Sequence, residues 1–321
     1  MRWIREDHYA ESMKSEVLPY INARKRTGFF ERVPGERIYF ERFTADSPKA
    51  AVVISHGFTE SIQKYYEAIW YFLQAGFSVW GADHRGHGKS FRQNANPYVV
   101  FVTDFEDYVR DLKFFTESKV IPASGKLPVY LYCHSMGGCI GARLIETDPT
   151  LFRKAVLSSP MLGLDFGKVP VPVVYAGAKL KSLVGSASQP LHPVVSYREE
   201  SFEQSCDSSR CRFDWYASLR RDRKELQTVS ASLGWGMEAA KACGQAVSRK
   251  WTAKIQIPVL LFQAGNDTVV KNASQDLFAS RVKTCTLARI PGMKHELFMT
   301  DSEVQIPYWE KIFSFFNEAR A

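Results

Sequence analysis

One serine of this chain lies in a setting that favours nucleophilic chemistry. The segment Leu131-Tyr132-Cys133-His134-Ser135-Met136-Gly137-Gly138 joins an apolar run, 128–132, to a helix-like pattern, 138–147. Small residues two before and two after Ser135 suit a sharp strand-to-helix turn that exposes the hydroxyl. The N-terminus of the following helix favours developing negative charge. We therefore predict that Ser135 is a nucleophile, against the alternative of an ordinary serine at a strand–helix junction.

The first small residue of this turn departs from the usual G-x-S-x-G pattern. Cys133 stands where glycine is typical, although cysteine is small enough for a tight turn. A thiol so close to Ser135 also leads to the hypothesis that bulky thiol reagents inhibit the protein.

A serine nucleophile needs a base and an acid that orients the base. Where this kind of turn occurs, the partners follow in the chain order serine, acid, histidine. Asp267 lies just past an apolar strand pattern, 257–263, and His295 lies just past a shorter one, 285–290. Either residue alone would pass for a loop residue. Their order and their common position after strands predict that His295 is the general base and Asp267 its orienting acid.

Two backbone N–H groups are candidates for stabilising the negative charge that develops on a substrate carbonyl oxygen. One belongs to Met136, directly after the serine, and the other to Phe58, after the apolar strand pattern 51–55. Gly57 suits the tight turn that would aim the Phe58 amide. His56 precedes the serine in the chain, and we interpret it as a structural brace of this loop.

Strand and helix patterns alternate through most of the chain. Strands are expected at 37–43, 51–55, 77–82, 128–132, 154–158, 257–263 and 285–290, and helices at 64–74, 104–118 and 138–147. This alternation predicts an α/β fold with a mostly parallel central sheet and helices on both faces.

The alternation stops between about 162 and 250, where prolines and clustered charges replace it. We expect a helical cap there, over the carboxyl ends of the strands. The chain is thus divided into an N-terminal extension (1–36), two parts of an α/β core (37–161 and 251–321) and a cap (162–250). Within the cap, the segment 169–184 mixes valines and leucines with Lys179 and Lys181. It suits either a lid that touches lipid or, as we favour, a helix packed on the core.

Composition limits the class of protein. With 321 residues, 45% of them hydrophobic, the chain can build one large core with an insertion. The N-terminus is too charged for a secretory signal, and no apolar stretch approaches the roughly 18 residues of a membrane span. The net charge of +8 is scattered and comes with no nucleic-acid motif, so no nucleic-acid partner is expected. Peripheral contact with an anionic membrane surface is the second interpretation of this charge.

The six cysteines predict free thiols in a reducing compartment, with a Cys206–Cys211 disulfide as the less favoured alternative. Their spacing does not suggest a metal site, and no cofactor motif is present, so we expect neither a metal nor a cofactor. We therefore expect a cytoplasmic protein, with contact at the inner face of the membrane as the further option.

These motifs together resemble those of the α/β-hydrolases, and more narrowly their branch of monoglyceride lipases and lysophospholipases. The resemblance rests on His56-Gly57-Phe58, Asp83-His84-Arg85-Gly86-His87-Gly88-Lys89-Ser90, His134-Ser135-Met136-Gly137-Gly138, Gly265-Asn266-Asp267 and His295-Glu296-Leu297. Two more stretches are similar to the bacterial lysophospholipase L2 type. They are Glu60-Ser61-x-x-Lys64-Tyr65 and Ser208-Ser209-Arg210-Cys211-Arg212, the latter with Trp235 further along. The similarity spans roughly 38–316.

The resemblance implies an α/β-hydrolase fold and a serine hydrolase that works through an acyl-enzyme. It assigns the nucleophile to Ser135, the base to His295, the acid to Asp267 and the oxyanion N–H groups to Phe58 and Met136. Asp83, Arg85 and His87 are expected to form a structural network behind the site.

The expected substrate is a lipid with a single acyl chain. Our first choice is hydrolysis of the fatty acyl ester of a lysophospholipid. The alternatives are a monoacylglycerol lipase or a general carboxylesterase with the same triad. From a different class, a non-catalytic α/β-hydrolase-like binding protein is less favoured, because such relatives generally lose part of the triad.

Overall fold

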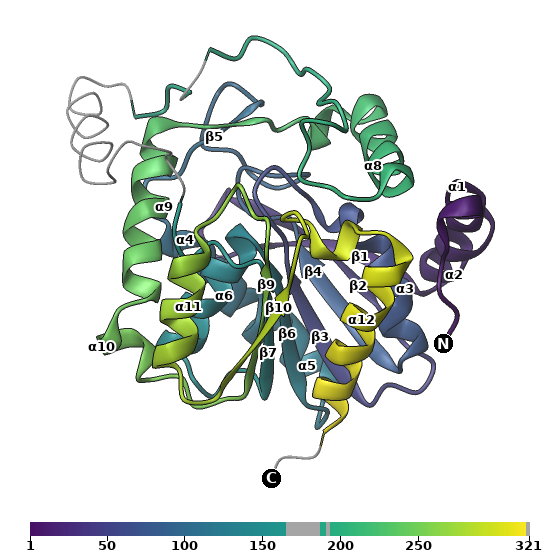
Figure 1. Cartoon of the computed structure of the whole chain (residues 1–321). Helices are drawn as coiled ribbons and strands as arrows, with labels where there is room; N and C mark the ends of the chain where they lie inside the picture. Colours follow the sequence, from purple (N-terminus) through teal and green to yellow (C-terminus); the bar gives the residue numbers. More distant parts are fainter. Residues whose placement is uncertain (165–186, 191–192, 319–321) are drawn as a thin grey trace.

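A computed structural model describes residues 1–164, 187–190 and 193–318 of the chain (Figure 1). Within these residues, eight strands form one sheet in the order β1-β2-β4-β3-β6-β7-β9-β10. In chain order the strands are β1 (Lys25–Glu31), β2 (Arg37–Phe43), β3 (Ala50–Ser55), β4 (Phe77–Ala82), β6 (Val129–His134), β7 (Lys154–Ser158), β9 (Val259–Ala264) and β10 (Cys285–Ile290). The pairs β1·β2 and β2·β4 are antiparallel and the other pairs are parallel. The predicted mostly parallel sheet is confirmed.

Helices cover both faces of this sheet (Figure 1). The helices of the described residues, including those of the cap region and the N-terminal segment, are α1 (Tyr9–Ser12), α2 (Leu18–Arg24), α3 (Tyr66–Gln74), α4 (Glu106–Phe115), α5 (Ile121–Ser124), α6 (Met136–Thr147), α8 (Arg210–Asp222), α9 (Leu233–Ala246), α10 (Arg249–Thr252), α11 (Asn272–Arg281) and α12 (Ser302–Asn317). Short 3-10 turns occupy Glu6–His8, Ile62–Tyr65, Lys224–Leu226 and Leu297–Met299, and π turns occupy Met13–Val17 and Thr116–Val120.

The central strands are buried on both faces, and their side chains alternate between two cores. In β6, for example, Leu131 packs with the core that includes α4, α6 and α9. Its neighbour Tyr132 packs with the opposite core, which includes α3 and α12. Packing on both faces holds the sheet in place. Because the parallel strands run in the same direction, their carboxyl ends lie at one edge of it.

The N-terminal segment contributes more than an extension. Residues 25–31, which we assigned to that extension, form β1, the antiparallel edge strand of the sheet. The π turn Met13–Val17 and α2 pack beside α3 through buried side chains such as Met13, Val17 and Ile21, and α1 contacts α8. The predicted boundary at residue 36 thus falls after the first strand.

The region expected to form a cap contains α8, α9 and the short strand β8 (Ser230–Ala231), which pairs with β5 (Val99–Val100) from the first part of the core. Figure 1 shows α8 above the sheet, whereas α9 runs beside α6. Ala239, Ala242 and Ala246 of α9 belong to the same core as α6. The segment 169–184, for which a lid or a packed helix was expected, lies outside the described residues.

A buried arginine fixes α8 to the core. Arg212 is fully buried, and its guanidinium donates hydrogen bonds to Glu67 of α3 at 2.9 Å and to Glu6 at 2.6 Å. It also reaches Gln305 of α12 at 3.0 Å. A planar guanidinium with five donors can join several segments in this way. Through Arg212, the Ser-Ser-Arg-Cys-Arg motif therefore anchors the first turn of α8 to the core.

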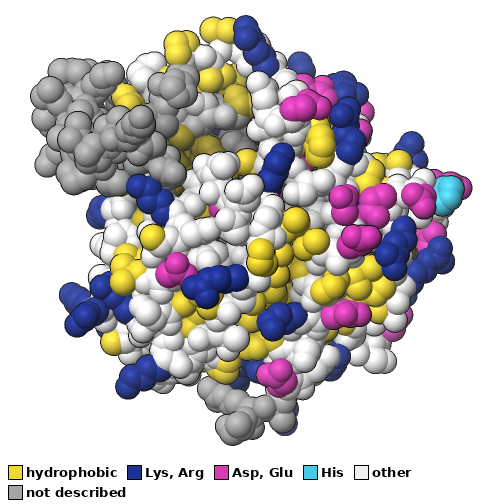
Figure 2. All heavy atoms as spheres, viewed as in Figure 1, with side chains coloured by type: hydrophobic (Ala, Val, Ile, Leu, Met, Phe, Trp, Pro, Cys, Tyr) yellow, Lys and Arg dark blue, Asp and Glu magenta, His cyan; other side chains and the backbone are white. Residues whose placement is uncertain are grey.

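In the described part of the chain, no helix is long and apolar enough to cross a membrane. On the face shown in Figure 2, lysine and arginine side chains are spread out rather than gathered into one patch. Contact with an anionic membrane surface stays a prediction.

Candidate active site

Ser135 lies in a strained turn between β6 and α6, as the sequence predicts. Its backbone has φ 51° and ψ −116°, a combination that costs energy for a residue with a Cβ atom. The carbonyl oxygen of Ser135 accepts hydrogen bonds from Gly138 and Met161, and its N–H donates to Ser158. These bonds hold the serine at the N-terminus of α6 and at the carboxyl edge of the sheet.

The two positions that flank the serine explain how this turn packs. A Cβ atom at Gly137 would overlap the carbonyl oxygen of Ser55 in β3, so only glycine fits there. At the other position, the Cys133 thiol lies where a Cβ atom at Gly141 would be. The missing side chain at Gly141 makes room for the thiol that departs from the usual pattern.

The same packing argues against the thiol-reagent hypothesis. Cys133 has no exposed surface, and burial raises the pKa of its thiol well above the usual value. A buried, protonated thiol is a poor nucleophile. All six cysteines are free, so the alternative Cys206–Cys211 disulfide is not formed.

Asp267 and His295 form a direct hydrogen-bonded pair. The Nδ1 atom of His295 lies 2.6 Å from Oδ2 of Asp267, while Oδ1 of Asp267 accepts hydrogen bonds from the amides of Val269 and Val270 at 2.8 and 3.0 Å. Burial alone would raise the pKa of Asp267, but the bond to His295 and these amides hold it below the usual value. An ionised Asp267 fixes the proton of His295 on Nδ1, which leaves Nε2 as the proton acceptor.

Ser135 and His295 line one pocket, which has a volume of about 430 Å³. The Nε2 atom of His295 is buried and has no hydrogen-bond partner among the described residues. Phe58 lines the same pocket, and Met136 follows Ser135 at the first position of α6. The structure thus brings the predicted residues together at one edge of the sheet.

The loop that carries Phe58 is braced by buried side chains. His56 accepts a hydrogen bond from the amide of His84 at 2.9 Å, and its other ring nitrogen lies 2.8 Å from the carbonyl oxygen of Gly57. The Gly57 amide donates to Glu60 at 2.6 Å. Burial lowers the pKa of His56 to about 4, so this ring is neutral at pH 7. His56 therefore holds the loop, as expected.

The Asp83-to-Ser90 motif forms a network of its own. Asp83 accepts hydrogen bonds from the amides of Ile62 and Lys89, both at 2.9 Å, and Arg85 pairs with Asp111 at 2.7 Å. The ring of His87 lies 3.0 Å from the carbonyl oxygen of Arg85. These partners all lie within the fold, which agrees with the structural role expected for the motif.

Next to His295 lies a cluster of buried charges that sequence reasoning did not assign to the site. The ammonium of Lys64 lies 2.8 Å from Glu60 and 3.0 Å from Glu296, and His134 lies 3.1 Å from Glu296. Burial would raise the pKa of Glu296, but Lys64 and His134 hold it well below its usual range. The sequence signal for this cluster was the four-residue spacing between Glu60 and Lys64. The pairing with Glu296 depends on the fold.

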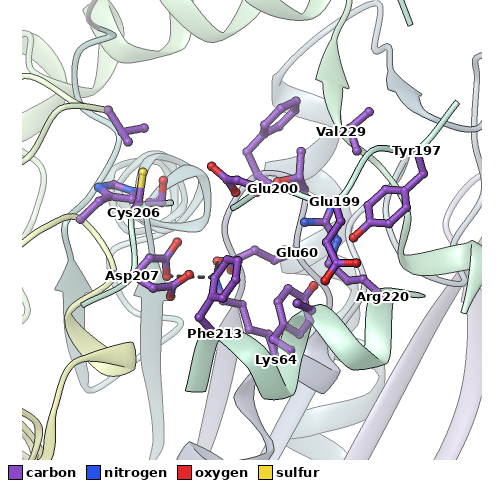
Figure 3. Close-up of a pocket in the computed structure, with 18 of the residues that line it drawn as sticks. Glu60, Lys64, Tyr197, Glu199, Glu200, Cys206, Asp207, Phe213, Arg220 and Val229 are labelled. Carbon is purple, nitrogen blue, oxygen red and sulfur yellow. Dashed lines mark hydrogen bonds and ion pairs between the residues drawn. The ribbon is translucent and has the colours of Figure 1, made fainter. Parts of the chain in front are cut away.

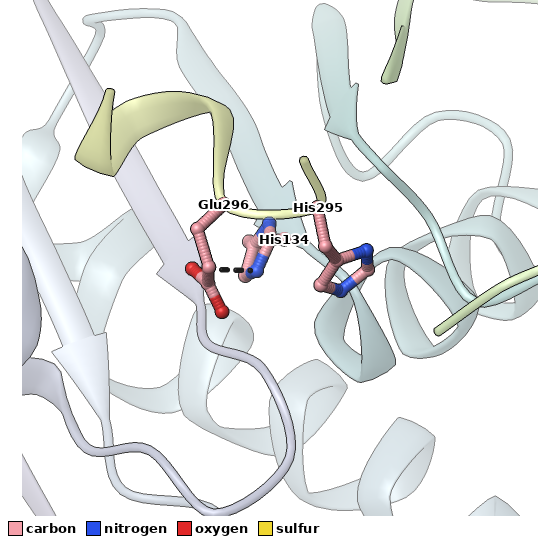
Figure 4. A group of neighbouring side chains, drawn as sticks. All are labelled: His134, His295 and Glu296. Carbon is pink, nitrogen blue, oxygen red and sulfur yellow. Dashed lines mark ion pairs between the residues drawn. The ribbon is translucent and has the colours of Figure 1, made fainter. Parts of the chain in front are cut away.

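His134, His295 and Glu296 are also close enough to suggest metal ligands, since one ligand atom from each lies within 4.8 Å of the others (Figure 4). The contacts of these residues favour another interpretation. Lys64 lies 3.0 Å from Glu296 and would repel a cation, while Nδ1 of His295 is engaged by Asp267. We interpret the group as parts of two neighbouring pairs: the hydrogen-bonded pair His295–Asp267 and the ion pair His134–Glu296.

The far side of the pocket is charged and comes mainly from the cap region (Figure 3). It includes Arg198, Glu199, Glu200, Asp207 and Arg220. No sequence pattern marked these residues, because their approach to Ser135 depends on how the cap folds back over the sheet. The pocket therefore has a sheet wall, which carries Ser135 and His295, and a charged cap wall.

The sheet order, the strained serine turn and the chain order of serine, aspartate and histidine define an α/β-hydrolase. A family model described as serine aminopeptidase, S33, matches residues 46–303, and the chain belongs to this family.

The chain is also similar to several known proteins. Lysophospholipase L2 of Escherichia coli (strain K12) is 37% identical over 127 residues, which are 40% of this chain and only 37% of that protein. The probable lysophospholipase L2 of Haemophilus influenzae is 24% identical over 327 residues, covering 98% of this chain and 99% of the relative. The crystal structure of Paleococcus ferrophilus monoacylglycerol lipase has a TM-score of 0.66 at 25% identity, covering 87% of this chain and 97% of that one. The chain thus spans little more than a third of the length of Escherichia coli lysophospholipase L2, while it matches the other two proteins over nearly their whole length.

Proposed function

We propose that the protein hydrolyses the fatty acyl ester of lysophospholipids through an acyl-enzyme on Ser135. The observation that carries this proposal is the strained Ser135 in one pocket with the His295–Asp267 pair. A serine hydroxyl is a weak nucleophile unless a base takes its proton, and His295 Nε2 is the acceptor available in this pocket.

The proposed reaction has two halves. His295 takes the proton of Ser135 while Oγ attacks the ester carbonyl carbon, and the amides of Phe58 and Met136 donate to the oxyanion. Among the described residues, neither amide donates a hydrogen bond to a protein acceptor. Collapse of the intermediate releases the glycerophospho-alcohol, which takes the proton from His295. Water then attacks the acyl-enzyme, with His295 as base, and the fatty acid leaves.

A charged headgroup is supported by the lining of the pocket and by the relatives. The cap side of the pocket holds negative carboxylates and positive guanidinium groups. Among the described residues, the buried Oδ1 of Asp207 on this side has no hydrogen-bond partner, and an uncharged glycerol would leave its charge unpaired. Two relatives are a lysophospholipase L2 and a probable lysophospholipase L2. A monoacylglycerol lipase is the second candidate, because a solved structure of that activity shares the fold.

The test is fatty acid release from a lysophospholipid and a monoacylglycerol of the same acyl chain, by wild type and by Ser135→Ala. The proposal predicts a higher kcat/KM on the lysophospholipid and a loss of at least about 100-fold in the variant. Preference for the glyceride would favour the second candidate. Release that persists in Ser135→Ala would overturn the proposed mechanism.

A further inference from the structure

Asp207 is a carboxylate in the pocket wall that forms no ion pair with another described residue. Asp207 is 8% exposed and lines the pocket beside Cys206 (Figure 3). The Oδ1 atom is buried without a hydrogen-bond partner among the described residues. Burying an unpaired carboxylate is costly, so such a group in a ligand pocket points to a partner that arrives with the ligand.

The nearby cations do not compensate this charge. Lys64 influences Asp207 through space but makes its close ion pairs with Glu60 and Glu296. The carboxylates of this cluster are Asp207, Glu60 and Glu296, and its bases are Lys64 and His134. When all five groups are charged, three negative charges face two positive ones, so the net charge is −1. Burial raises the pKa of Asp207 to about 7, as expected for a carboxylate that lacks a full counter-charge.

We propose that Asp207 binds the ammonium group of the substrate headgroup and makes the enzyme selective for lysophospholipids whose headgroup carries an amine. The inference rests on the proposed lysophospholipase function. An ammonium group would donate a charge-assisted hydrogen bond to Asp207 and neutralise the excess charge of the cluster. A neutral hydroxyl would satisfy the hydrogen bond but leave that charge uncompensated.

The surrounding wall suits a zwitterionic headgroup. The aromatic ring of Phe213 lines the pocket together with Asp207, and the face of such a ring attracts a cation. Arg220 also lines the pocket and donates to the carbonyl oxygens of Leu226 and Thr228. Among the described residues its guanidinium forms no ion pair with a carboxylate, which leaves its positive charge for a phosphate.

The test compares three substrates with one acyl chain: lysophosphatidylethanolamine, lysophosphatidylglycerol and monoacylglycerol. Wild type, Asp207→Asn and Asp207→Glu are assayed as the full chain for kcat and KM. Glu203→Gln is the matched control, because it removes an exposed carboxylate from the same cap segment, four residues before Asp207 and outside the lining of the pocket. We expect Asp207→Asn to lower kcat/KM on the ethanolamine lipid by about 10- to 100-fold, mainly through KM. The other two substrates should change by less than about threefold, and Asp207→Glu should recover part of the loss.

Each other outcome overturns the inference in a distinguishable way. An equal loss of kcat/KM on all three substrates would mean that Asp207 has a structural role. No loss on any substrate would mean that Asp207 does not bind the headgroup. A comparable loss in Glu203→Gln would mean that the overall charge of the cap, and not a contact of Asp207, determines the preference. Wild type that hydrolyses only the glyceride would remove the proposed function itself, and the headgroup site with it.

Discussion

The two walls of the pocket are held by different forces. On the sheet wall, Ser135 is fixed by backbone hydrogen bonds and by glycines that leave no space for a side chain. On the cap wall, α8 is fixed by Arg212, whose buried charge is shared with Glu67 and Glu6. The comparison teaches that the proposed nucleophile is positioned by backbone packing that resists change, whereas the position of the cap wall depends on charges that respond to substitution and pH.

Removing the buried charge that anchors the cap wall should have the largest effect on stability. Arg212→Met would leave Glu67 buried without its counter-ion, which costs about 3–5 kcal/mol of unfolding free energy. Arg210→Met, two residues earlier and exposed, should change stability by less than about 0.5 kcal/mol. Urea unfolding of both variants measures the difference. Equal stabilities would refute the anchoring role of Arg212.

The sheet wall should respond to a single added methyl group. Gly137→Ala pushes a Cβ atom into the backbone of β3, and we expect a loss of about 2–3 kcal/mol and at least a 100-fold loss of activity. In Gly244→Ala the new Cβ atom meets nothing within 4 Å in helix α9, and stability should stay equal or rise by up to about 1 kcal/mol. Assays of ester hydrolysis and thermal unfolding on Gly137→Ala and Gly244→Ala test these expectations. A fully active Gly137→Ala would show that the turn is not tightly packed.

The cap anchor should weaken in acid. Burial raises the pKa of Glu6, but hydrogen bonds from Ser302 and Arg212 prevail and lower it from 4.5 to about 2. A lowered carboxylate pKa stabilises the fold above the unfolded-state pKa, and this stabilisation is lost as pH falls through the folded-state pKa.

Glu6→Gln should therefore be less stable than wild type at pH 7, by about 1 kcal/mol because the side chain is one-third exposed. The difference should shrink between pH 4.5 and 2. Unfolding measured across this range, with the exposed Glu11→Gln as control, tests the prediction. A difference that does not change with pH would exclude a charged interaction.

The smallest effect concerns the unusual cysteine of the serine turn. Cys133→Gly restores the common residue but should cost about 1 kcal/mol, because it leaves a void beside Gly141. Gly141→Ala should destabilise wild type yet be tolerated in the Cys133→Gly background. A double-mutant cycle should give a coupling of about 1 kcal/mol. Additive effects would mean that the two positions do not compensate each other.

The sequence predicted the sheet wall well, because local patterns determine it. The bounds of β4, β7 and β10 agree with the predicted 77–82, 154–158 and 285–290. Ser135, Asp267 and His295 each follow a strand, and the carboxyl ends of parallel strands meet at one edge, so their approach could be inferred without coordinates.

The remaining features depend on contacts between distant segments. Arg212 and Glu67 are 145 residues apart, and Lys64 meets Glu296 only when the fold closes. The edge strand β1 escaped prediction because its polar residues and Gly28 leave little apolar alternation. Asp207 lies in a cap segment with no strand–helix pattern, so nothing in the sequence placed it in the pocket.

The central claim is that Ser135, activated by His295 and Asp267, is the residue acylated in the reaction. The most direct measurement is covalent labelling with a fluorophosphonate probe, followed by intact mass and peptide mapping. Wild type should gain one adduct, on Ser135, and Ser135→Ala should gain none. Asp267→Asn, folded to the same extent, should label at least about 1000-fold more slowly, because His295 loses the partner that fixes its proton. Rapid labelling of another residue, or labelling of Asp267→Asn at the wild-type rate, would contradict the account.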